Sequence, residues 1–340
     1  MIVAVEILAA AQLAVISALA VLLTVRRVAV ARCDRRRERL LDRYRDSVLE
    51  FVGMDEEHPP AELRELRTTE QREAVSTLLA QYTSEVKGDP RRRVAQFADH
   101  QGYASAAVAD LRAVRAWRRG TAAKTLGDFA VPAAAGDLAD LLSGDRSPVV
   151  RATSARALGR AGGAAAAADL VAACGQAVPA GVAAQALLDI GPESMPWVLG
   201  ALSSPRPAVR EMACRVIGLT GASGEWDVVS PLEQAATGDG SVAVRVAACE
   251  ALGRVGGREA ALAVVGATSD GEAVVRRAAC DAATRLAAPE LAGAVRRALD
   301  DRAPEVRRSA ARAAVVLGVA ALRPNEFRQE AEAEMAWGWS

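Results

Sequence analysis

The chain has 340 residues, of which 51% are apolar and only 4% aromatic, so it can bury a large surface made mostly of small side chains. Its 42 basic and 42 acidic residues give a formal net charge of +0. This balance excludes any argument for nucleic-acid binding that rests on the charge of the whole chain.

The first element is an apolar run of 24 residues, from Ile2 to Val25, in which Glu6 is the only charged residue. At about 1.5 Å per residue a helix of this length crosses a hydrocarbon core of about 30 Å. Six arginines follow within 26–37, and no basic side chain precedes the run. A secretory signal peptide has the opposite arrangement. The positive-inside rule therefore predicts a signal-anchor helix over 1–25, in the cell (inner) membrane, with the amino terminus outside and the bulk of the chain cytoplasmic.

This membrane anchor has two alternatives. A lipoprotein is excluded because Arg32 stands directly before Cys33. A buried helix of a water-soluble protein stays as the alternative for 2–25. Within the span one face carries small or polar residues that would let another membrane helix approach, unless Glu6 simply reaches the outer headgroups. This predicted contact face consists of Glu6, Ala10, Ala14 and Ser17.

Residues 26–53 are predicted to form a basic juxtamembrane amphipathic helix. Nine arginines stand against three acids over 26–45, and one side of the helix carries Leu40, Leu41, Tyr44, Val48 and Phe51. Each arginine near anionic headgroups contributes about 1 kcal/mol. Two further helices are expected over 61–86 and 94–117, separated by Gly88-Asp89-Pro90. Residues 54–116 are then either a helical adaptor or an amino-terminal cap on the remaining chain.

A motif that returns every thirty-odd residues organises the rest of the chain. It reads Asp145-Arg-Ser-Pro-Val-Val-Arg-Ala-Thr-Ser-Ala-Arg-Ala-Leu-Gly159, and again Asp239-Gly-Ser-Val-Ala-Val-Arg-Val-Ala-Ala-Cys-Glu-Ala-Leu-Gly253. Counting a degenerate copy with Ala183 in place of the arginine, there are seven units, spaced 32, 32, 27, 35, 31 and 31 residues apart. A period of this length predicts a stacked α-solenoid over 117–323. The anchoring arginines are Arg119, Arg151, Arg210, Arg245, Arg276 and Arg307.

Each unit is expected to form two helices joined by a turn. The aspartate six positions before the arginine, as in Asp145 and Asp239, is well placed for a helix cap, and the glycine of Leu-Gly for a left-handed helix stop. The arginines and aspartates are expected to hold successive turns together. This pattern resembles the bacterial HEAT-like repeats of the PBS-lyase type. The resemblance implies an all-α fold of about seven stacked helix pairs with a concave surface for partners.

Residues that could support catalysis are scarce. The two histidines, His58 and His100, lie outside the clear repeats, and the chain has neither a His-Glu pair nor a phosphate-binding glycine loop. Cys214, Cys249 and Cys280 share a position that three other units fill with alanine and one with leucine, which predicts small buried thiols. We therefore expect no enzyme activity, no cofactor and no metal site.

The predicted binding surface is the face of each second helix that carries the positions one, five and nine after the anchoring arginine. In a HEAT stack the second helices line the concave side, so this stripe of mixed charge would meet a protein partner. The alternative is an ordinary solvated face. The stripe consists of Arg156, Arg160, Arg215, Glu250, Arg254, Arg277, Asp281, Arg285, Arg308 and Arg312.

The carboxyl-terminal tail, 324–340, contains Trp337 and Trp339 among its last four residues. These tryptophans either cap the last repeat or anchor a partner or the membrane interface.

Taken together, these features predict a non-enzymatic membrane-anchored scaffold. The segment Val114-Arg-Ala-Trp-Arg-Arg-Gly-Thr-Ala-Ala-Lys-Thr-Leu-Gly127 resembles a group of bacterial proteins with one membrane helix, an arginine-rich stretch and HEAT-like repeats. That resemblance implies association with a polytopic membrane glycosyltransferase that makes envelope or extracellular polysaccharide. Two alternatives are a HEAT enzyme of the bilin-lyase kind and, less favoured by the neutral charge, a HEAT-type nucleic-acid binder.

Overall fold

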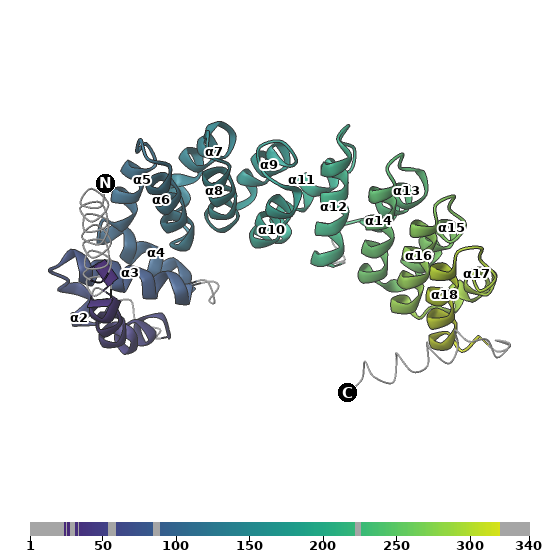
Figure 1. Cartoon of the computed structure of the whole chain (residues 1–340), viewed down its shortest axis with the longest axis horizontal. Coiled ribbons are helices and arrows are strands. Elements are labelled where there is room, and N and C mark those ends of the chain that lie inside the picture. The colour runs from purple at the N-terminus through teal and green to yellow at the C-terminus, as the bar shows by residue number, and fades with distance from the viewer. Residues whose placement is uncertain are drawn as a thin grey trace, which may run out of the picture. The chain divides into compact units, whose positions relative to one another are not determined.

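The computed structural model describes residues 24, 26–27, 31–32, 34–53, 59–83, 89–221 and 226–319. In these residues the chain is helical apart from turns and one isolated bridge between Cys174 and Val178. It divides into two compact units, Met1–Ser105 and Ala106–Ser340 (Figure 1). None of the described helices has the length and apolar character needed to span a bilayer. The run 2–25 lies, apart from Thr24, outside the described residues.

The first unit contains the helix over 34–53, then α2 (Ala61–Arg64), α3 (Thr69–Thr83) and α4 (Asp89–His100). The described helix over 34–53 is amphipathic, since Tyr44, Val48 and Phe51 are all buried, while its predicted place beside a membrane stays a prediction. The rings of Phe51 and Phe97 pack with centroids 5.3 Å apart, which joins this helix to α4. The division between the units falls within α5 (Tyr103–Asp110).

The two long helices expected over 61–86 and 94–117 are wrong, because each is interrupted. Thr68 and Gln71 form a capping box that starts α3 at Thr69: the Gln71 side chain accepts the Thr68 N–H at 3.0 Å, and the Thr68 hydroxyl accepts the Gln71 N–H at 3.2 Å. The second expected helix breaks after α4 at Gly102, whose φ of 74° is left-handed, and again between α5 and α6.

The second unit contains the repeat. In the part of the chain that the structure describes, seven second helices follow one another in a single row, and each packs against the next. The fourth residue of every one of these helices is an anchoring arginine, or Ala183 in the degenerate copy, so the period read from the sequence is confirmed. The row consists of α6 (Ala116–Asp128), α8 (Pro148–Ala161), α10 (Ala180–Ile190), α12 (Pro207–Thr220), α14 (Val242–Val255), α16 (Ala273–Leu286) and α18 (Pro304–Val316).

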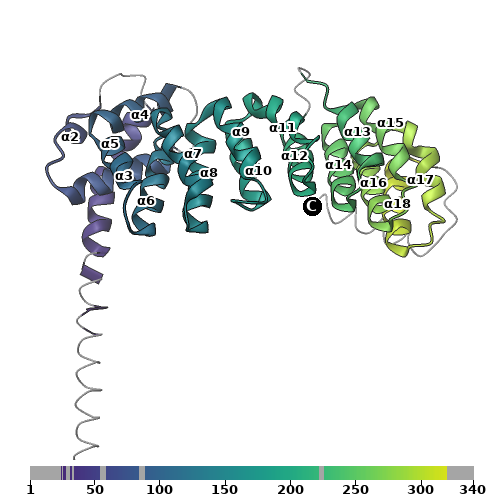
Figure 2. The ribbon, with the colours of Figure 1, turned by 90° about the horizontal axis from the view of Figure 1, so that it is seen from above.

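A second row is made by the first helix of each pair. In Figure 1 this row lies on the outer side of the curved second unit, and the row of second helices lies on its inner side. Figure 2 shows the helices of both rows stacked along the same direction. The outer row consists of α7 (Ala135–Gly144), α9 (Gly163–Ala173), α11 (Met195–Ala201), α13 (Val229–Gly238), α15 (Gly257–Ala267) and α17 (Ala292–Ala298), with short 3₁₀ turns at Pro132–Ala134, Pro192–Ser194 and Pro289–Leu291.

The glycine of Leu-Gly or Ile-Gly is a packing residue in four of the five units that have it, and its expected role as a helix stop is wrong there. Gly127, Gly159, Gly218 and Gly253 lie inside their helices. A Cβ atom placed on Gly218 would lie 2.7 Å from the Cα of Ala251 on the next helix. Gly191 alone acts as a stop, with a φ of 87° at the end of α10. Glycine therefore sets the distance between neighbouring second helices.

Candidate partner-binding surface

The anchoring arginines hold the solenoid together. Arg210 donates to both carboxylate oxygens of Asp239 in the next unit, at 2.6 and 2.8 Å, and to the carbonyl of Ser204 in its own turn at 2.8 Å. Arg119, Arg245 and Arg276 bind Asp145, Asp270 and Asp301 in the same way. The expectation that these residues link successive turns is confirmed, so the role of these arginine side chains is structural.

The aspartates are not helix caps in the strict sense. Asp145 stands two residues before the cap position of α8, where it accepts the N–H of Ser147 at 2.8 Å, and no side-chain cap bond is made at Ser147 itself. The bidentate bond from Arg119 and this N–H lower the pKa of Asp145, against the opposing effect of burial. The aspartate thus fixes the turn before the helix.

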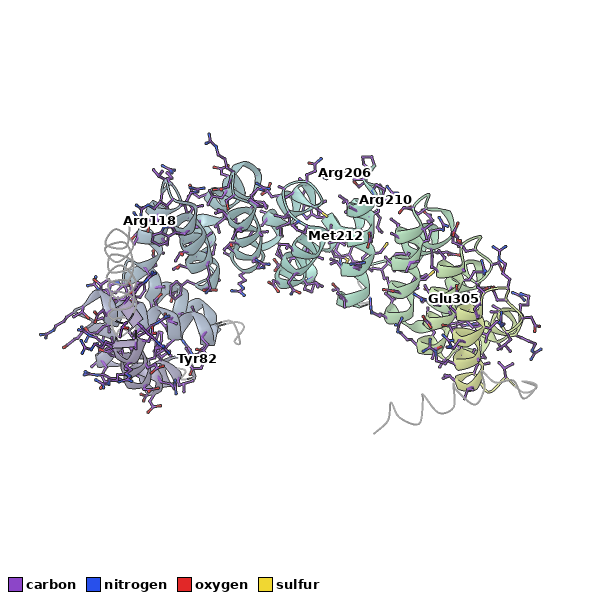
Figure 3. The ribbon with its side chains drawn as sticks, viewed as in Figure 1. Tyr82, Arg118, Arg206, Arg210, Met212 and Glu305 are labelled. Carbon is purple, nitrogen blue, oxygen red and sulfur yellow. The ribbon has the colours of Figure 1, made fainter. Side chains whose placement is uncertain are left out.

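The third unit lacks the link between arginine and aspartate because it has neither of these two residues at the expected positions. Ala177 stands where the aspartate would be, and its carbonyl accepts the Nε–H of Arg151 at 2.8 Å. Ala183 replaces the arginine, and Arg206 instead donates backwards to the carbonyl of Cys174 at 2.9 Å. Arg206 and Arg210 lie beside the first turn of α12 (Figure 3). Main-chain acceptors therefore replace a carboxylate at this one junction.

The predicted stripe lies on the exposed face of the inner row, and ion pairs occupy part of it. Arg160 binds Asp128 at 2.6 Å, Arg215 binds Glu211 at 2.6 Å and Arg312 binds Asp281 at 3.0 Å. Arg254 is 4.0 Å from Glu250, and Arg308 is exposed on α18. Within the described chain no ion pair is formed by Arg156, Arg277 or Arg285, which are all exposed. These three are the cations of the stripe that are available to a partner.

A groove between α6 and α8 adds residues that were not expected from the sequence. It has a volume of about 440 Å³ and is lined by Trp117, Gly120 and Lys124 from α6 and by Val149 and Thr153 from α8, among others. Trp117 is 64% exposed and Val149 is 71% exposed. Both stand two positions before the anchoring arginine, where Ala208 and Ala243 stand in later units. An aromatic residue at this position of the repeat was the sequence signal that could have indicated the groove.

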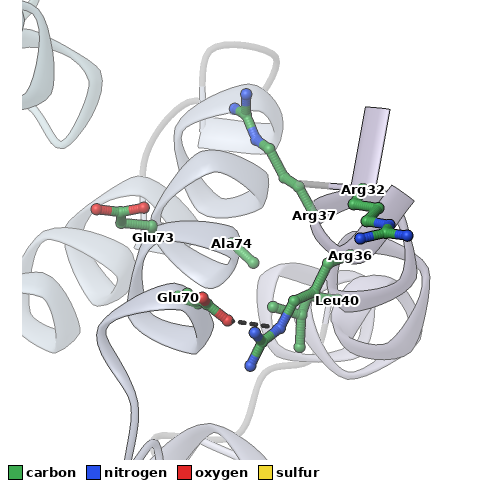
Figure 4. Close-up of a pocket in the computed structure, with 7 residues that line it drawn as sticks. All are labelled: Arg32, Arg36, Arg37, Leu40, Glu70, Glu73 and Ala74. Carbon is green, nitrogen blue, oxygen red and sulfur yellow. Dashed lines mark ion pairs between the residues drawn. The ribbon is translucent and has the colours of Figure 1, made fainter. Parts of the chain in front are cut away.

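The first unit contains a separate pocket of about 330 Å³ between the helix over 34–53 and α3. Arg36 reaches across it to Glu70, with Nε 2.9 Å from a carboxylate oxygen, and Arg32, Arg37 and Glu73 stand around the pair (Figure 4). Because three arginines meet two glutamates here, the pocket has mixed charge. The pair is more than half exposed and contributes on the order of 0.5 kcal/mol to stability.

The described residues include no cluster of His, Cys, Asp and Glu that could hold a metal ion. The prediction that Cys214, Cys249 and Cys280 are buried packing residues is confirmed. Burial raises the pKa of each of these thiols to about 12, so they are poor nucleophiles at neutral pH.

Several predicted site residues lie outside the described residues. These are the membrane contact face of Glu6, Ala10, Ala14 and Ser17, and the tail tryptophans Trp337 and Trp339.

A comparison with known protein families matches part of the repeat region. Residues 111–191 and 194–267 match the family model described as HEAT repeats. Human deoxyhypusine hydroxylase is 17% identical, with a TM-score of 0.33 over 84% of this chain and 98% of that one. The CpcE–CpcF phycocyanin lyase complex of a Nostoc species is 20% identical, with a TM-score of 0.32 over 68% and 93%. The Pds5–Scc1 complex is 12% identical, with a TM-score of 0.38 over 86% and 60%.

No curated protein is significantly similar in sequence to this chain. What the chain resembles, over residues 111–191 and 194–267, is the HEAT-repeat family, and the described part of its second unit is an all-α solenoid of that kind.

Proposed function

We propose that this protein is a non-enzymatic scaffold that binds a protein partner on the inner face of its solenoid. HEAT repeats form extended surfaces for protein interaction. The observation that carries the proposal is the set of exposed arginines on this face, Arg156, Arg277 and Arg285, for which the described chain supplies no ion pair. Arginine is enriched at protein interfaces because its planar group binds carboxylates in two places at once.

The scaffold is anchored in the cell membrane by the apolar run 2–25, with the solenoid on the cytoplasmic side. This part of the proposal rests on the sequence alone, that is, on a run long enough to span and on the arginines that follow it. A phosphatase reporter, active only outside the cytoplasm, fused after Ser340 tests the topology. We expect no reporter activity in intact cells, and the same reporter fused before Met1 serves as the positive control. Activity of the carboxyl-terminal fusion would contradict the cytoplasmic placement.

The partner is a polytopic membrane protein, such as a glycosyltransferase that makes envelope or extracellular polysaccharide. The resemblance of the segment 114–127 to membrane-anchored HEAT-like proteins supports this choice. A scaffold fixed at the membrane by one helix also meets a membrane partner at high effective concentration.

Charge reversal at two sites on one inner-row helix tests the inner face. The double variant Arg277→Glu, Arg285→Glu on α16 is expected to lower recovery of the partner, after gentle solubilisation and affinity purification, by about tenfold, because like charges across an interface cost more than 1 kcal/mol. The matched control is Arg296→Glu, Arg297→Glu on α17 in the outer row, where both arginines are also exposed. Equal loss in both variants, or no stoichiometric partner with the wild type, would contradict the proposal.

The enzyme alternative has its own signature. A bilin-lyase activity would produce a coloured tetrapyrrole adduct on an acceptor protein when pigment and chain are mixed. We expect none, because the described residues form no cluster for a metal and bury their thiols.

A further inference from the structure

The groove between α6 and α8 combines an apolar end with a cationic end. At the start of the two helices Trp117 and Val149 stand exposed, and Gly120, which has no side chain, leaves space between them. The face of α6 then continues to Lys124, one of only two lysines in the chain. An exposed tryptophan beside an open apolar groove is the type of residue that dominates protein interfaces.

The charges around the groove are predominantly positive. Lys124 and Arg160 both bind Asp128, which neutralises one of them, and Arg156 occupies on α8 the position that Lys124 holds on α6. At the apolar end, Arg115 is the cap residue of α6, and Arg146 is exposed in the turn before α8. Asp145, in the same turn as Arg146, is buried and bound by Arg119, so the exposed charges around the groove are mainly cations, which favours acidic ligands.

Further along the same face the cations are interrupted by acids. Glu211, Glu250 and Asp281 each lie within 4.0 Å of an arginine of the stripe. A nucleic acid presents phosphates at regular short intervals and needs a continuous row of cations. A peptide needs only a local cluster next to an apolar anchor, and the α6–α8 groove supplies that combination.

We propose that the α6–α8 groove binds an acidic peptide segment of the partner. The segment places an apolar side chain between Trp117 and Val149 and its carboxylates against Lys124 and Arg156. This inference rests on the proposed function and names the chemistry of the partner at one place on the inner face. The volume of about 440 Å³ is within the range of pockets that bury small ligands and single side chains.

Fluorescence anisotropy with three labelled peptides tests the inference on the full-length chain in nanodiscs of neutral lipid. The first peptide carries glutamates and aspartates around a central Leu-Phe pair. The second has Ala-Ala in place of that pair, and the third has glutamine and asparagine in place of the acids. We expect the first peptide to bind, and the other two to bind about tenfold more weakly.

Four variants locate the binding site. Trp117→Ala and Lys124→Gln are each expected to weaken the first peptide by about tenfold. Trp197→Ala is the matched control for the aromatic change, since this tryptophan is 48% exposed on α11 of the outer row. Arg297→Gln is the control for the loss of one cation. Because Trp117 and Lys124 are exposed, their replacement should leave the helical circular dichroism unchanged.

The outcomes separate this inference from the proposed function. Failure of the first peptide to bind, or binding that is unchanged in Trp117→Ala and Lys124→Gln, overturns the groove assignment. Displacement of that peptide by single-stranded RNA or by phosphatidylglycerol vesicles would also overturn it in favour of another anionic ligand. If the wild type recovers its partner and both groove variants recover it equally, the proposed scaffold function holds and the groove assignment is wrong. If the wild type recovers no partner, the proposed function fails whatever the peptides do.

Discussion

Replacing Gly218 by valine is expected to lower the free energy of unfolding of the solenoid by about 3 kcal/mol, the upper part of the range for overpacked cores. Gly218 lies inside α12, where even a single Cβ atom would approach the Cα of Ala251 to 2.7 Å and its Cβ to 3.0 Å. The backbone of α14 cannot yield as a flexible side chain can. The two helices must therefore move apart, and contacts along their length are lost. Chemical denaturation followed by helical circular dichroism measures the change.

Alanine at the same position separates two opposing effects. In a free helix Gly→Ala is worth about 1 kcal/mol in favour of folding. At Gly218 the clash with Ala251 outweighs that gain, so Gly218→Ala is expected to destabilise. The matched control is Gly136→Ala on α7, where a Cβ atom meets nothing within 4 Å and the substitution should stabilise. If both variants are stabilised alike, α12 and α14 do not approach as closely as the structure shows.

Replacing Asp239 by alanine is expected to cost about 3 kcal/mol, because it leaves a part-buried charge without its partner. The guanidinium of Arg210, whose side chain is only 17% exposed, would lose both carboxylate bonds, and the N–H of Ser241 would lose its acceptor. Asp169→Ala, an exposed acid on α9, is the control and should change stability by less than about 0.5 kcal/mol. Removing both charges, with Arg210→Met added to Asp239→Asn, should recover part of the loss.

The same pair makes stability depend on pH. The bond from Arg210 lowers the pKa of Asp239, with the Ser241 N–H assisting and burial opposing. A carboxyl group with a lowered native pKa contributes stability above its unfolded pKa of about 3.9, and this contribution is lost as the pH falls through the native value. The difference in melting temperature between the wild type and Asp239→Asn should therefore be constant near neutral pH and shrink in acid. A difference that stays constant down to pH values well below about 3.9 would contradict this origin.

The repeat could be read from the sequence because most units carry the same local pattern. The arginine near the start of the second helix has the same kind of partners in four units, so Arg119, Arg210, Arg245 and Arg276 follow one rule. The same periodicity identified the cysteine slot as a packing position. Because the pattern recurs in several units, it predicts the helices more reliably than the sequence of a single helix would.

Local sequence signals were less reliable where the same residue type fits two different structural roles. Glycine after leucine fits a helix stop and also fits a close contact between helices. The second cause operates at Gly159, Gly218 and Gly253, where the contacting alanine lies in the next unit and is not visible locally. The capping box of Thr68 and Gln71 lies inside the range that was expected to be one continuous helix, and it starts α3 there.

By itself the sequence determined the period, the number of units, the buried cysteines and the links between turns, because these depend on residues that recur at fixed spacing. Only the tertiary structure decided which charges of the inner face are already paired and which remain exposed. Asp128, for example, binds Lys124 from its own helix and Arg160 from the next one. It also decided that Trp117 and Val149 stand on either side of a groove. Both outcomes depend on the distance between neighbouring helices, which the contacts of glycine with alanine set and no single repeat encodes.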